Sequence, residues 1–252
     1  MHPILFKLGP VTIYTYGFFV FLGVVLGYFI CSREAKRQGI DSKVFSDIIF
    51  WVIISAFLGA KLLYLLIEMK YFLIEPLAMI RSGFVFYGGV ITGICAIYIL
   101  SRKYNIYFLN LADIIVLGVP LAHALGRVGC FFYGCCYGKP TSSWIGIQFP
   151  LGSPAGELCT RVIPTQLISA FFLLVLFLII LAISRKKIFS GQVSSCYLIF
   201  YGVFRFTIEF FRGDPRGYIL YFSTSQIISF ILVLLGIILF YMGSLNAKRK
   251  VV

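Results

Sequence analysis

Seven stretches of the sequence are long and apolar enough to cross a lipid bilayer, and they leave little of the chain for anything else. A spanning helix needs roughly 20 mainly apolar residues. With 60% of its residues hydrophobic and 12% charged, the chain has too little polar surface to fold as a soluble globule. The sequence therefore predicts one all-α polytopic membrane domain over residues 1–252, with seven transmembrane helices near 14–31, 46–67, 84–100, 109–126, 165–184, 192–211 and 224–243.

The positions of lysine and arginine predict how these helices are oriented. Cytoplasmic loops carry an excess of basic residues close to the ends of transmembrane helices. An outside N-terminus satisfies this rule and places the C-terminus in the cytoplasm, because seven spans leave the two termini on opposite sides. The long connection 127–163 then forms a small extracytoplasmic cap between the fourth and fifth helices. The inner basic clusters are Arg33, Lys36, Arg37 and Lys43, then Arg102 and Lys103, then Arg185, Lys186 and Lys187, then Lys248, Arg249 and Lys250.

The net charge of +13 indicates contact with a membrane surface rather than with nucleic acid. The basic residues lie in short clusters between apolar segments, where they set topology and meet anionic lipid headgroups. We therefore expect the lipid bilayer as a partner, and a monomer that binds no nucleic acid.

Two spans carry small residues at a spacing of four, Gly23 with Gly27 and Gly89 with Gly93. Such pairs allow the backbones of neighbouring membrane helices to approach closely. They predict helix packing and not a ligand site.

Residues 121–141, LAHALGRVGCFFYGCCYGKPT, combine charge with a flexible backbone and predict a functional site. His123 and Arg127 are four residues apart, so both project from the same face of a helix. A bilayer tolerates such residues only where partners or water are close. Gly129 and Gly138 follow, in a segment that can fold tightly over a ligand.

A second group of charges lies near the end of segment 192–211. Arg205, Glu209 and Arg212 follow one another at helical spacings of four and three, which places them along one face. One interpretation is an ion triad whose charges compensate each other within the membrane. The other is that the unmatched positive charge, together with Arg127, forms an anion site, since each guanidinium group can bind a phosphate through two hydrogen bonds.

Four further polar residues have two interpretations each. His123 is either a packing residue or a general base, because a neighbouring cation favours the neutral imidazole that a base requires. Lys61 either pairs with Glu68 or reaches the interface, or it lines the cavity of the site. Tyr16 and Tyr87 either anchor their helices at the membrane interface or direct hydroxyl groups into that cavity.

The seven cysteines show no CxxC pair and no cysteine and histidine spacing typical of zinc, so we expect neither a metal nor another cofactor. Cys135 and Cys136 are adjacent, and a disulfide between neighbours is strained. In an oxidising compartment, a bridge from this pair to Cys130 or Cys159 is the more favourable arrangement.

Two segments resemble the signature sequences of the bacterial phosphatidylglycerol–prolipoprotein diacylglyceryl transferases. GRVGCFFYGCCYGKPT at 126–141 is similar to the signature loop of that family, and YGVFRFTIEFFRGDP at 201–215 is similar to its second arginine segment. Further matches follow in the order of the family, so the resemblance covers nearly the whole chain. They are TYGF at 15–18, FLGAKLLYLL at 57–66, GFVFYGG at 83–89, IPTQL at 163–167 and STSQI at 223–227.

The resemblance implies a multi-pass enzyme of the bacterial cytoplasmic, or inner, membrane with the topology predicted above. Its reaction is the transfer of the diacylglyceryl group of phosphatidylglycerol to the lipobox cysteine thiol in the signal peptide of a preprolipoprotein. A thioether forms and glycerol phosphate is released. This reaction is the first step of lipoprotein maturation.

The implied site residues fall into two groups. Arg127 and Arg205 are expected to stabilise the negative charge that collects on the departing phosphate, and His123 or Tyr87 to take the proton of the acceptor thiol. The residues expected to bind phosphatidylglycerol are Arg127, Arg205, Arg212, Glu209, Tyr16, Lys61, Gly126, Gly129 and Gly138.

The chain departs from the pattern of that family at four positions. Tyr87 stands where the family commonly has histidine, and Lys61 where arginine is usual. Cys130 replaces an asparagine, and Cys135 an acidic residue. Two other functions stay open: a membrane thiol oxidoreductase, which would require an essential Cys135 or Cys136, and an anion transporter, whose polar residues would reach the inner half of the bundle.

Overall fold

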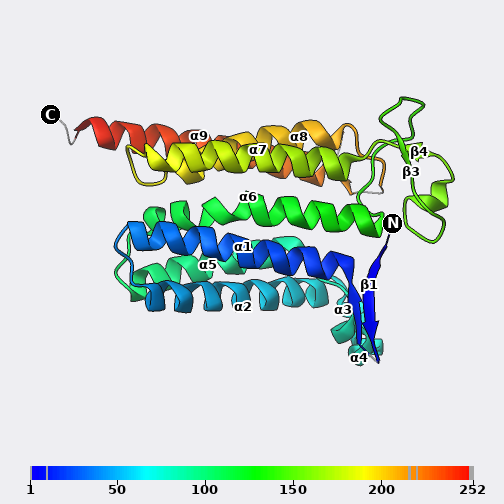
Figure 1. The fold of residues 1–252 in the computed structure, drawn as a ribbon. Helices are drawn as coiled ribbons and strands as arrows, with labels where there is room; N and C mark the ends of the chain where they lie inside the picture. The colour runs from blue at the N-terminus through cyan, green and yellow to red at the C-terminus, as the bar shows by residue number, and fades with distance from the viewer. Residues whose placement is uncertain (1, 10, 215–216, 220, 250–252) are drawn as a thin grey trace. The chain divides into compact units, whose positions relative to one another are not determined.

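The computed structural model describes residues 2–9, 11–214, 217–219 and 221–249, and helices dominate these parts of the chain (Figure 1). The chain divides into two compact units. The first combines Met1–Cys31 with Asp113–Val252, and the second is Ser32–Ala112.

Each predicted span corresponds to a helix. Within the described residues, five helices are long and apolar enough to cross a membrane: α1, α2, α6, α7 and α9. α5 and α8 are shorter, with 18 residues each. The prediction of a polytopic all-α membrane protein is confirmed, whereas the count of seven spans stays a prediction. The helices are α1 (Thr15–Arg37), α2 (Ser42–Ile67), α5 (Phe86–Lys103), α6 (Phe108–Tyr133), α7 (Thr165–Arg185), α8 (Gln192–Glu209) and α9 (Thr224–Arg249).

Helix α6 continues well into the predicted loop 127–163. Its last residue is Tyr133, so Arg127 and Gly129 lie on the helix and not in a loop. The cause is the sequence FFY, which extends the apolar run. The helix stops at Gly134, whose φ of 82° is the left-handed conformation that commonly ends helices.

Helix α8 is shorter than the predicted span 192–211. It ends at Glu209, and Arg212 therefore lies beyond the helix instead of on its face. The sequence Gly213–Asp214–Pro215 explains the early end, because glycine and proline disfavour continued helix and proline also restricts the residue before it.

Several short elements occupy segments that were expected to be simple connections. Two of the small antiparallel sheets in the described segments belong to them, and a pair of short helices follows α2. These elements are β1 (Ile4–Leu8) paired with β2 (Val11–Tyr14), β5 (Tyr218–Ile219) paired with β6 (Phe222–Ser223), α3 (Met69–Ile74) and α4 (Pro76–Arg81).

The connection between α6 and α7 has a small core of its own. It contains β3 (Ile147–Gln148) paired with β4 (Arg161–Val162), and the 3₁₀ turn η1 (Gly156–Leu158). A buried apolar cluster holds it together. The cluster consists of Tyr137, Phe149, Ala155 and Val162, with Phe131 and Ile147 packed against it.

Glycines bring α1 close to α6 within the first unit. A Cβ atom at Gly23 would lie 2.9 Å from the Cα atom of Ala122, and one at Gly27 would lie 3.3 Å from the carbonyl oxygen of Gly118. The packing role predicted for Gly23 and Gly27 is therefore confirmed.

Glycines also join α2 to α5 within the second unit. A Cβ atom at Gly89 would lie 2.8 Å from the carbonyl oxygen of Ala56, and Gly59 and Gly88 face each other more closely still. The Thr92 hydroxyl donates to the Ser55 carbonyl at 2.7 Å across the same contact. Gly93 meets only the Ala56 side chain at an ordinary 3.8 Å.

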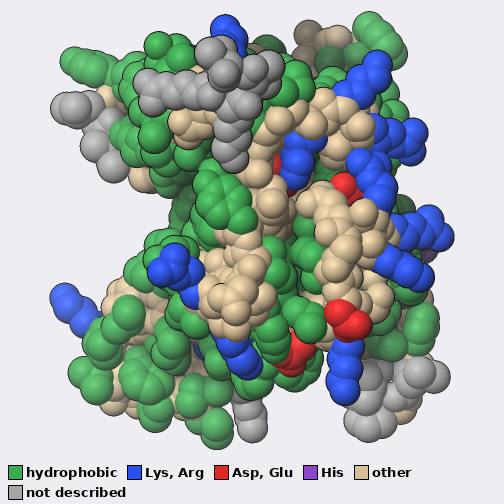
Figure 2. Space-filling model, turned by 90° about the vertical axis from the view of Figure 1, so that its left-hand side faces the viewer, with side chains coloured by type: hydrophobic (Ala, Val, Ile, Leu, Met, Phe, Trp, Pro, Cys, Tyr) green, Lys and Arg blue, Asp and Glu red, His purple; other side chains and the backbone are tan. Residues whose placement is uncertain are grey.

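Basic side chains are exposed at helix ends in each unit. In Ser32–Ala112 they lie at the end of α1, the start of α2 and the end of α5, and in the first unit they lie at the end of α7 and directly after it. Figure 2 shows Lys and Arg side chains to be more prominent than Asp and Glu on the face that it presents. The exposed basic residues are Arg33, Lys36, Arg37, Lys43, Arg102, Lys103, Arg185 and Lys186.

Candidate active site

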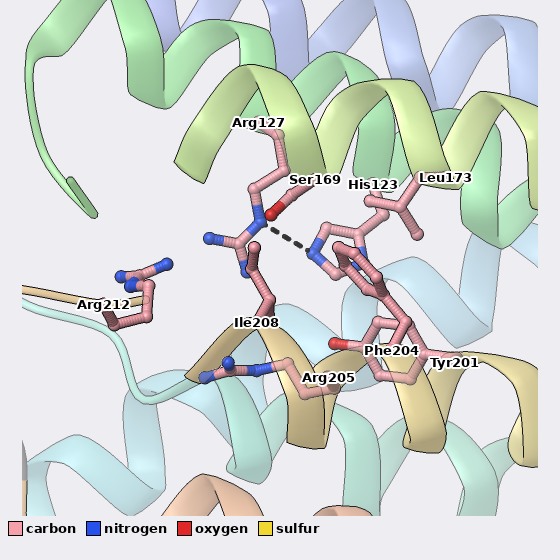
Figure 3. A pocket seen from close by; sticks show the side chains of 9 residues that line it. All are labelled: His123, Arg127, Ser169, Leu173, Tyr201, Phe204, Arg205, Ile208 and Arg212. Atoms are coloured by element: carbon pink, nitrogen blue, oxygen red, sulfur yellow. Dashed lines mark hydrogen bonds between the residues drawn. The ribbon is translucent and has the colours of Figure 1, made fainter. Parts of the chain in front are cut away.

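A pocket in the first unit collects most of the predicted charged residues. Its empty space is about 220 Å³, and three helices and the segment after α8 contribute side chains to it. Figure 3 shows the guanidinium groups of Arg127, Arg205 and Arg212 on the same side of this pocket. Its lining residues are His123 and Arg127 of α6, Ser169 and Leu173 of α7, Tyr201, Phe204, Arg205 and Ile208 of α8, and Arg212.

Arg127 is held by a neutral partner. Its Nε donates a hydrogen bond to His123 Nε2 at 3.2 Å, one helical turn away (Figure 3). No Asp or Glu in the described parts of the chain forms an ion pair with it. The positive charge of Arg127 is thus not offset by a neighbouring carboxylate.

Arg205 has an acidic partner on its own helix. It forms an ion pair with Glu209, whose carboxylate is buried, and its second terminal nitrogen donates to the Ser225 hydroxyl of α9 at 2.7 Å. The pairing expected from their spacing of four is therefore confirmed.

Arg212 pairs with a residue that the spacing argument did not consider. Its Nε and a terminal nitrogen donate to the two carboxylate oxygens of Asp214 at 2.8 and 2.9 Å. Burial acts to lower the pKa of Arg212, but hydrogen bonds and charge interactions with Asp214 and Cys136 together raise it, so the guanidinium stays charged. The interpretation as a single ion triad on one helix face was wrong, since two separate ion pairs, Arg205 with Glu209 and Arg212 with Asp214, are present instead.

Among the residues that the structure describes, the charges around the pocket leave one positive charge in excess. Three guanidinium groups line it, and two carboxylates, Glu209 and Asp214, pair with two of them. The surplus resides on Arg127. A site of this kind suits a ligand with a single negative charge, because a buried charge must be compensated.

Two polar lining residues were missed from the sequence. The ring of Tyr201 lies 5.6 Å from that of His123 and stacks on Tyr197 at 5.4 Å between ring centroids. Figure 3 shows its hydroxyl directed toward the side where the guanidinium groups lie. Tyr201 precedes Arg205 by four residues, so helical spacing could have found it. Ser169 gave no such signal.

Lys61 belongs to the second unit and caps a helix there. Its ammonium group donates to the carbonyl oxygens of Met79 at 3.0 Å, of Gly83 at 3.1 Å and of Ser82. It also lies 4.9 Å from the centre of the Phe84 ring. The interpretation that paired Lys61 with Glu68 was wrong, because the carbonyls at the end of α4 bind the cation instead.

Tyr87 also belongs to the second unit, in the first turn of α5. Its side chain is exposed, and its ring makes an edge contact with Phe86. The roles of Tyr87 and Lys61 in a substrate site stay predictions.

Of the three glycines expected to approach the lipid headgroup, two pack against protein. A Cβ atom at Gly129 would lie 3.1 Å from the Cα atom of Tyr16 in α1, and one at Gly138 would lie 2.6 Å from the Ile163 carbonyl oxygen. Gly126 faces open space within 4 Å. The contact of Gly129 places Tyr16 beside the last turns of α6.

None of the seven cysteines is bridged. Cys159 is exposed and is not linked to the Cys135–Cys136 pair. The thiol sulfur atoms of Cys130, Cys135 and Cys136 nevertheless lie within 4.8 Å of one another.

Comparisons with known proteins identify the family of the chain. A family model described as prolipoprotein diacylglyceryl transferase matches residues 3–242. The chain belongs to the prolipoprotein diacylglyceryl transferase family. Relatives named phosphatidylglycerol–prolipoprotein diacylglyceryl transferase are similar over nearly their whole length. The one from Clostridium tetani is 39% identical over 242 residues, which cover 95% of this chain and 97% of the relative.

Two more relatives extend this finding. Phosphatidylglycerol–prolipoprotein diacylglyceryl transferase 2 from Clostridium perfringens is 36% identical over 255 residues, which cover 99% of this chain and 98% of the relative. The Geobacter sulfurreducens protein is 36% identical over 259 residues, 99% of this chain and 96% of its own. The resemblance in the sequence and the prediction of a transferase of lipoprotein biosynthesis are confirmed. No comparison favours an anion transporter or a thiol oxidoreductase.

Proposed function

We propose that this member of the prolipoprotein diacylglyceryl transferase family transfers the diacylglyceryl group of phosphatidylglycerol to the lipobox cysteine thiol of a preprolipoprotein signal peptide. The thiolate sulfur attacks the glyceryl carbon that carries the phosphate, and the carbon–oxygen bond breaks. Its electron pair stays on the phosphate oxygen, so glycerol phosphate leaves. The observation that carries the proposal is the pocket with one positive charge in excess, because a phosphodiester carries one negative charge.

Arg127 is the principal phosphate ligand in this mechanism. It lacks a carboxylate partner among the described residues, and its guanidinium lines the pocket with those of Arg205 and Arg212. As the bond breaks, negative charge grows on the phosphate. Donors already directed at that position stabilise the transition state more than the ground state. Arg205 and Arg212 support it from their ion pairs with Glu209 and Asp214.

His123 becomes available as a base when phosphate binds. In the structure its Nε2 lone pair accepts the Arg127 Nε hydrogen bond. A bound phosphate competes for that donor, and a turn of Arg127 toward the phosphate frees Nε2. A free thiol is only a few per cent thiolate at pH 7, so removal of its proton raises the rate. Tyr87 remains the second candidate for this role.

In this mechanism the pocket receives the headgroup phosphate. The acyl chains of the lipid lie outside it, against apolar helix surfaces. Exposed side chains of this kind on α7 include Phe171, Leu174 and Leu178.

The positions of the exposed basic residues support a membrane placement for this enzyme. We infer seven spans, with α5 and α8 as the two shorter ones, in the bacterial cytoplasmic membrane. The exposed basic residues at the ends of α1, α5 and α7 face the cytoplasm, which leaves the N-terminus and the connection between α6 and α7 outside. The lipobox cysteine then approaches from the outer leaflet, and a monomer suffices for the site.

Replacement of Arg127 tests the proposal. We expect Arg127→Ala to lower transfer of labelled diacylglyceryl from phosphatidylglycerol to a lipobox peptide by about 100- to 1,000-fold, the usual loss for one transition-state donor. Arg127→Lys keeps the charge but loses the planar fork, and should recover only part of the rate.

The matched control is Arg185→Ala, which removes an exposed arginine outside the pocket in the same unit. It should transfer at the rate of the unchanged protein. Full turnover by an Arg127→Ala protein that inserts normally would rule out the phosphate site.

A further inference from the structure

Three cysteine thiols converge at the end of α6. Cys130 lies in the last turn of that helix, and Cys135 and Cys136 follow directly after it. Their sulfur atoms all lie within 4.8 Å of one another, and each residue is partly buried. A metal ion can be shared by thiol, imidazole or carboxylate side chains that lie this close together. Among the described residues, the three thiols meet that condition.

The backbone around these thiols is fixed by hydrogen bonds. The amides of Gly134 and Cys135 donate to the Cys130 carbonyl at 2.9 and 3.2 Å, which turns the chain back on the helix end. Cys136 adopts a left-handed conformation with φ of 63°. The loop therefore returns the pair of thiols to the side chain of Cys130.

Two fully buried residues of α7 fix the other side of the pair. The Gln166 side chain donates to the Cys135 carbonyl at 2.7 Å, and the Thr165 hydroxyl donates to the Cys136 carbonyl at 2.8 Å. With both carbonyls engaged there, the thiols face one another without a covalent bond. Such a preorganised set of ligands lowers the entropic cost of binding an ion.

We propose that Cys130, Cys135 and Cys136 form a binding site for one thiophilic d¹⁰ metal ion, of the class that includes Cu(I) and Zn(II). Three sulfur ligands at about 2.3 Å from an ion lie about 4 Å apart in a trigonal arrangement, so the thiols need to approach by less than about 1 Å. Cu(I) accepts three thiolates, and Zn(II) completes its tetrahedron with water.

The site was not evident from the sequence, because the spacing from Cys130 to the adjacent pair matches no common zinc pattern. Two of its ligands, Cys130 and Cys135, also occupy positions where the chain departs from the family signature. The proposal is independent of the transferase mechanism, since it assigns no role in transfer to the three thiols.

Metal titration of the purified protein in detergent, under reducing conditions, tests the site. We expect one Cu(I) or Zn(II) per chain, measured by competition with a chromophoric chelator for each ion. Cys130→Ser, Cys135→Ser and Cys136→Ser should each weaken binding by at least about 100-fold, because each removes a ligand. Cys159→Ser, which removes an exposed thiol in the same unit, should bind as the unchanged protein does.

A second measurement needs no substitution. Bound metal should protect Cys130, Cys135 and Cys136 from alkylation, mapped by mass spectrometry, while Cys159 stays reactive. Three results would overturn the proposal: no binding by the unchanged protein, equal binding by the triple serine variant, or a disulfide within the trio in protein isolated under reducing conditions.

Discussion

At the scale of single residues, the three arginines of the pocket differ in their partners. Arg205 and Arg212 each hold a carboxylate, whereas Arg127 holds the neutral ring of His123. An arginine already paired with an acid gains less from a phosphate, since it must share its donors. In the proposed mechanism, the hydrogen bond between Arg127 and His123 joins phosphate binding to the availability of a base.

Substitution of His123 by glutamine separates its two roles. Glutamine can still accept a hydrogen bond from Arg127, but it cannot take the proton of a thiol. We expect His123→Gln to lower kcat by about 100- to 10,000-fold, the usual contribution of a general base, with little change in KM for phosphatidylglycerol.

Tyr87→Phe is the companion variant for this comparison, and it should transfer at close to the normal rate. A normal rate for His123→Gln with a slow Tyr87→Phe would assign the base to Tyr87. Normal rates for both would mean that neither residue takes the proton.

The sequence was informative about contacts within one helix. The spacing of four predicted both the Arg127–His123 and the Arg205–Glu209 contacts, because helix geometry alone brings such pairs together. The partner of Arg212 could not be predicted in this way, since it depends on where α8 ends. The carbonyl partners of Lys61 likewise depend on a short helix that the sequence did not predict.

At the scale of elements, close helix contact depends on positions that lack a side chain. Hydrophobic length located the helices, but it could not locate their ends, because α6 continues through three aromatic residues to Gly134. Arg127 therefore lies on a rigid helix. Gly129, half a turn further, fits that helix against Tyr16 of α1.

Gly126 and Gly129 form a matched pair for testing this packing. A methyl group at Gly129 would lie 3.1 Å from the Tyr16 backbone, so Gly129→Ala should lower the thermal unfolding midpoint of the protein in detergent. Gly126 has open space, so Gly126→Ala should raise that midpoint slightly, because alanine stabilises a helix interior by up to about 1 kcal/mol relative to glycine.

An unchanged midpoint for Gly129→Ala would contradict the packing role. The transfer activity of Gly126→Ala then tests the headgroup contact predicted for Gly126. A variant that is stable but transfers slowly would indicate that the lipid headgroup occupies the open space beside Gly126.

At the scale of the whole molecule, one carboxylate joins two helices of the first unit, α6 and α8, away from the pocket residues that these helices carry. Asp113 of α6 is buried and accepts hydrogen bonds from the amides of Gly191 and Ser194 and from the Ser194 hydroxyl, each at 2.8 Å. Lys187 forms an ion pair with it at 3.4 Å. It thereby fixes the start of α8, the helix that carries Arg205.

We expect Asp113→Asn to destabilise the protein by about 1–3 kcal/mol, because an amide nitrogen would then face buried donors. The measurement is the thermal unfolding midpoint in detergent, which should fall by several degrees. Glu157→Gln, at an exposed acid in the same unit, is the control. Equal midpoints for the two variants would show that the buried carboxylate contributes nothing to stability.

The single surplus charge on Arg127 also bears on how turnover ends. A phosphate monoester carries about −1.5 to −2 near pH 7, whereas the diester from which it is cut carries −1. The departing glycerol phosphate thus carries more negative charge than the surplus positive charge of the pocket can compensate. Water solvates the excess negative charge better than the pocket does. Dissociation of glycerol phosphate is favoured for that reason, and Arg127 can then bind the phosphate of the next lipid.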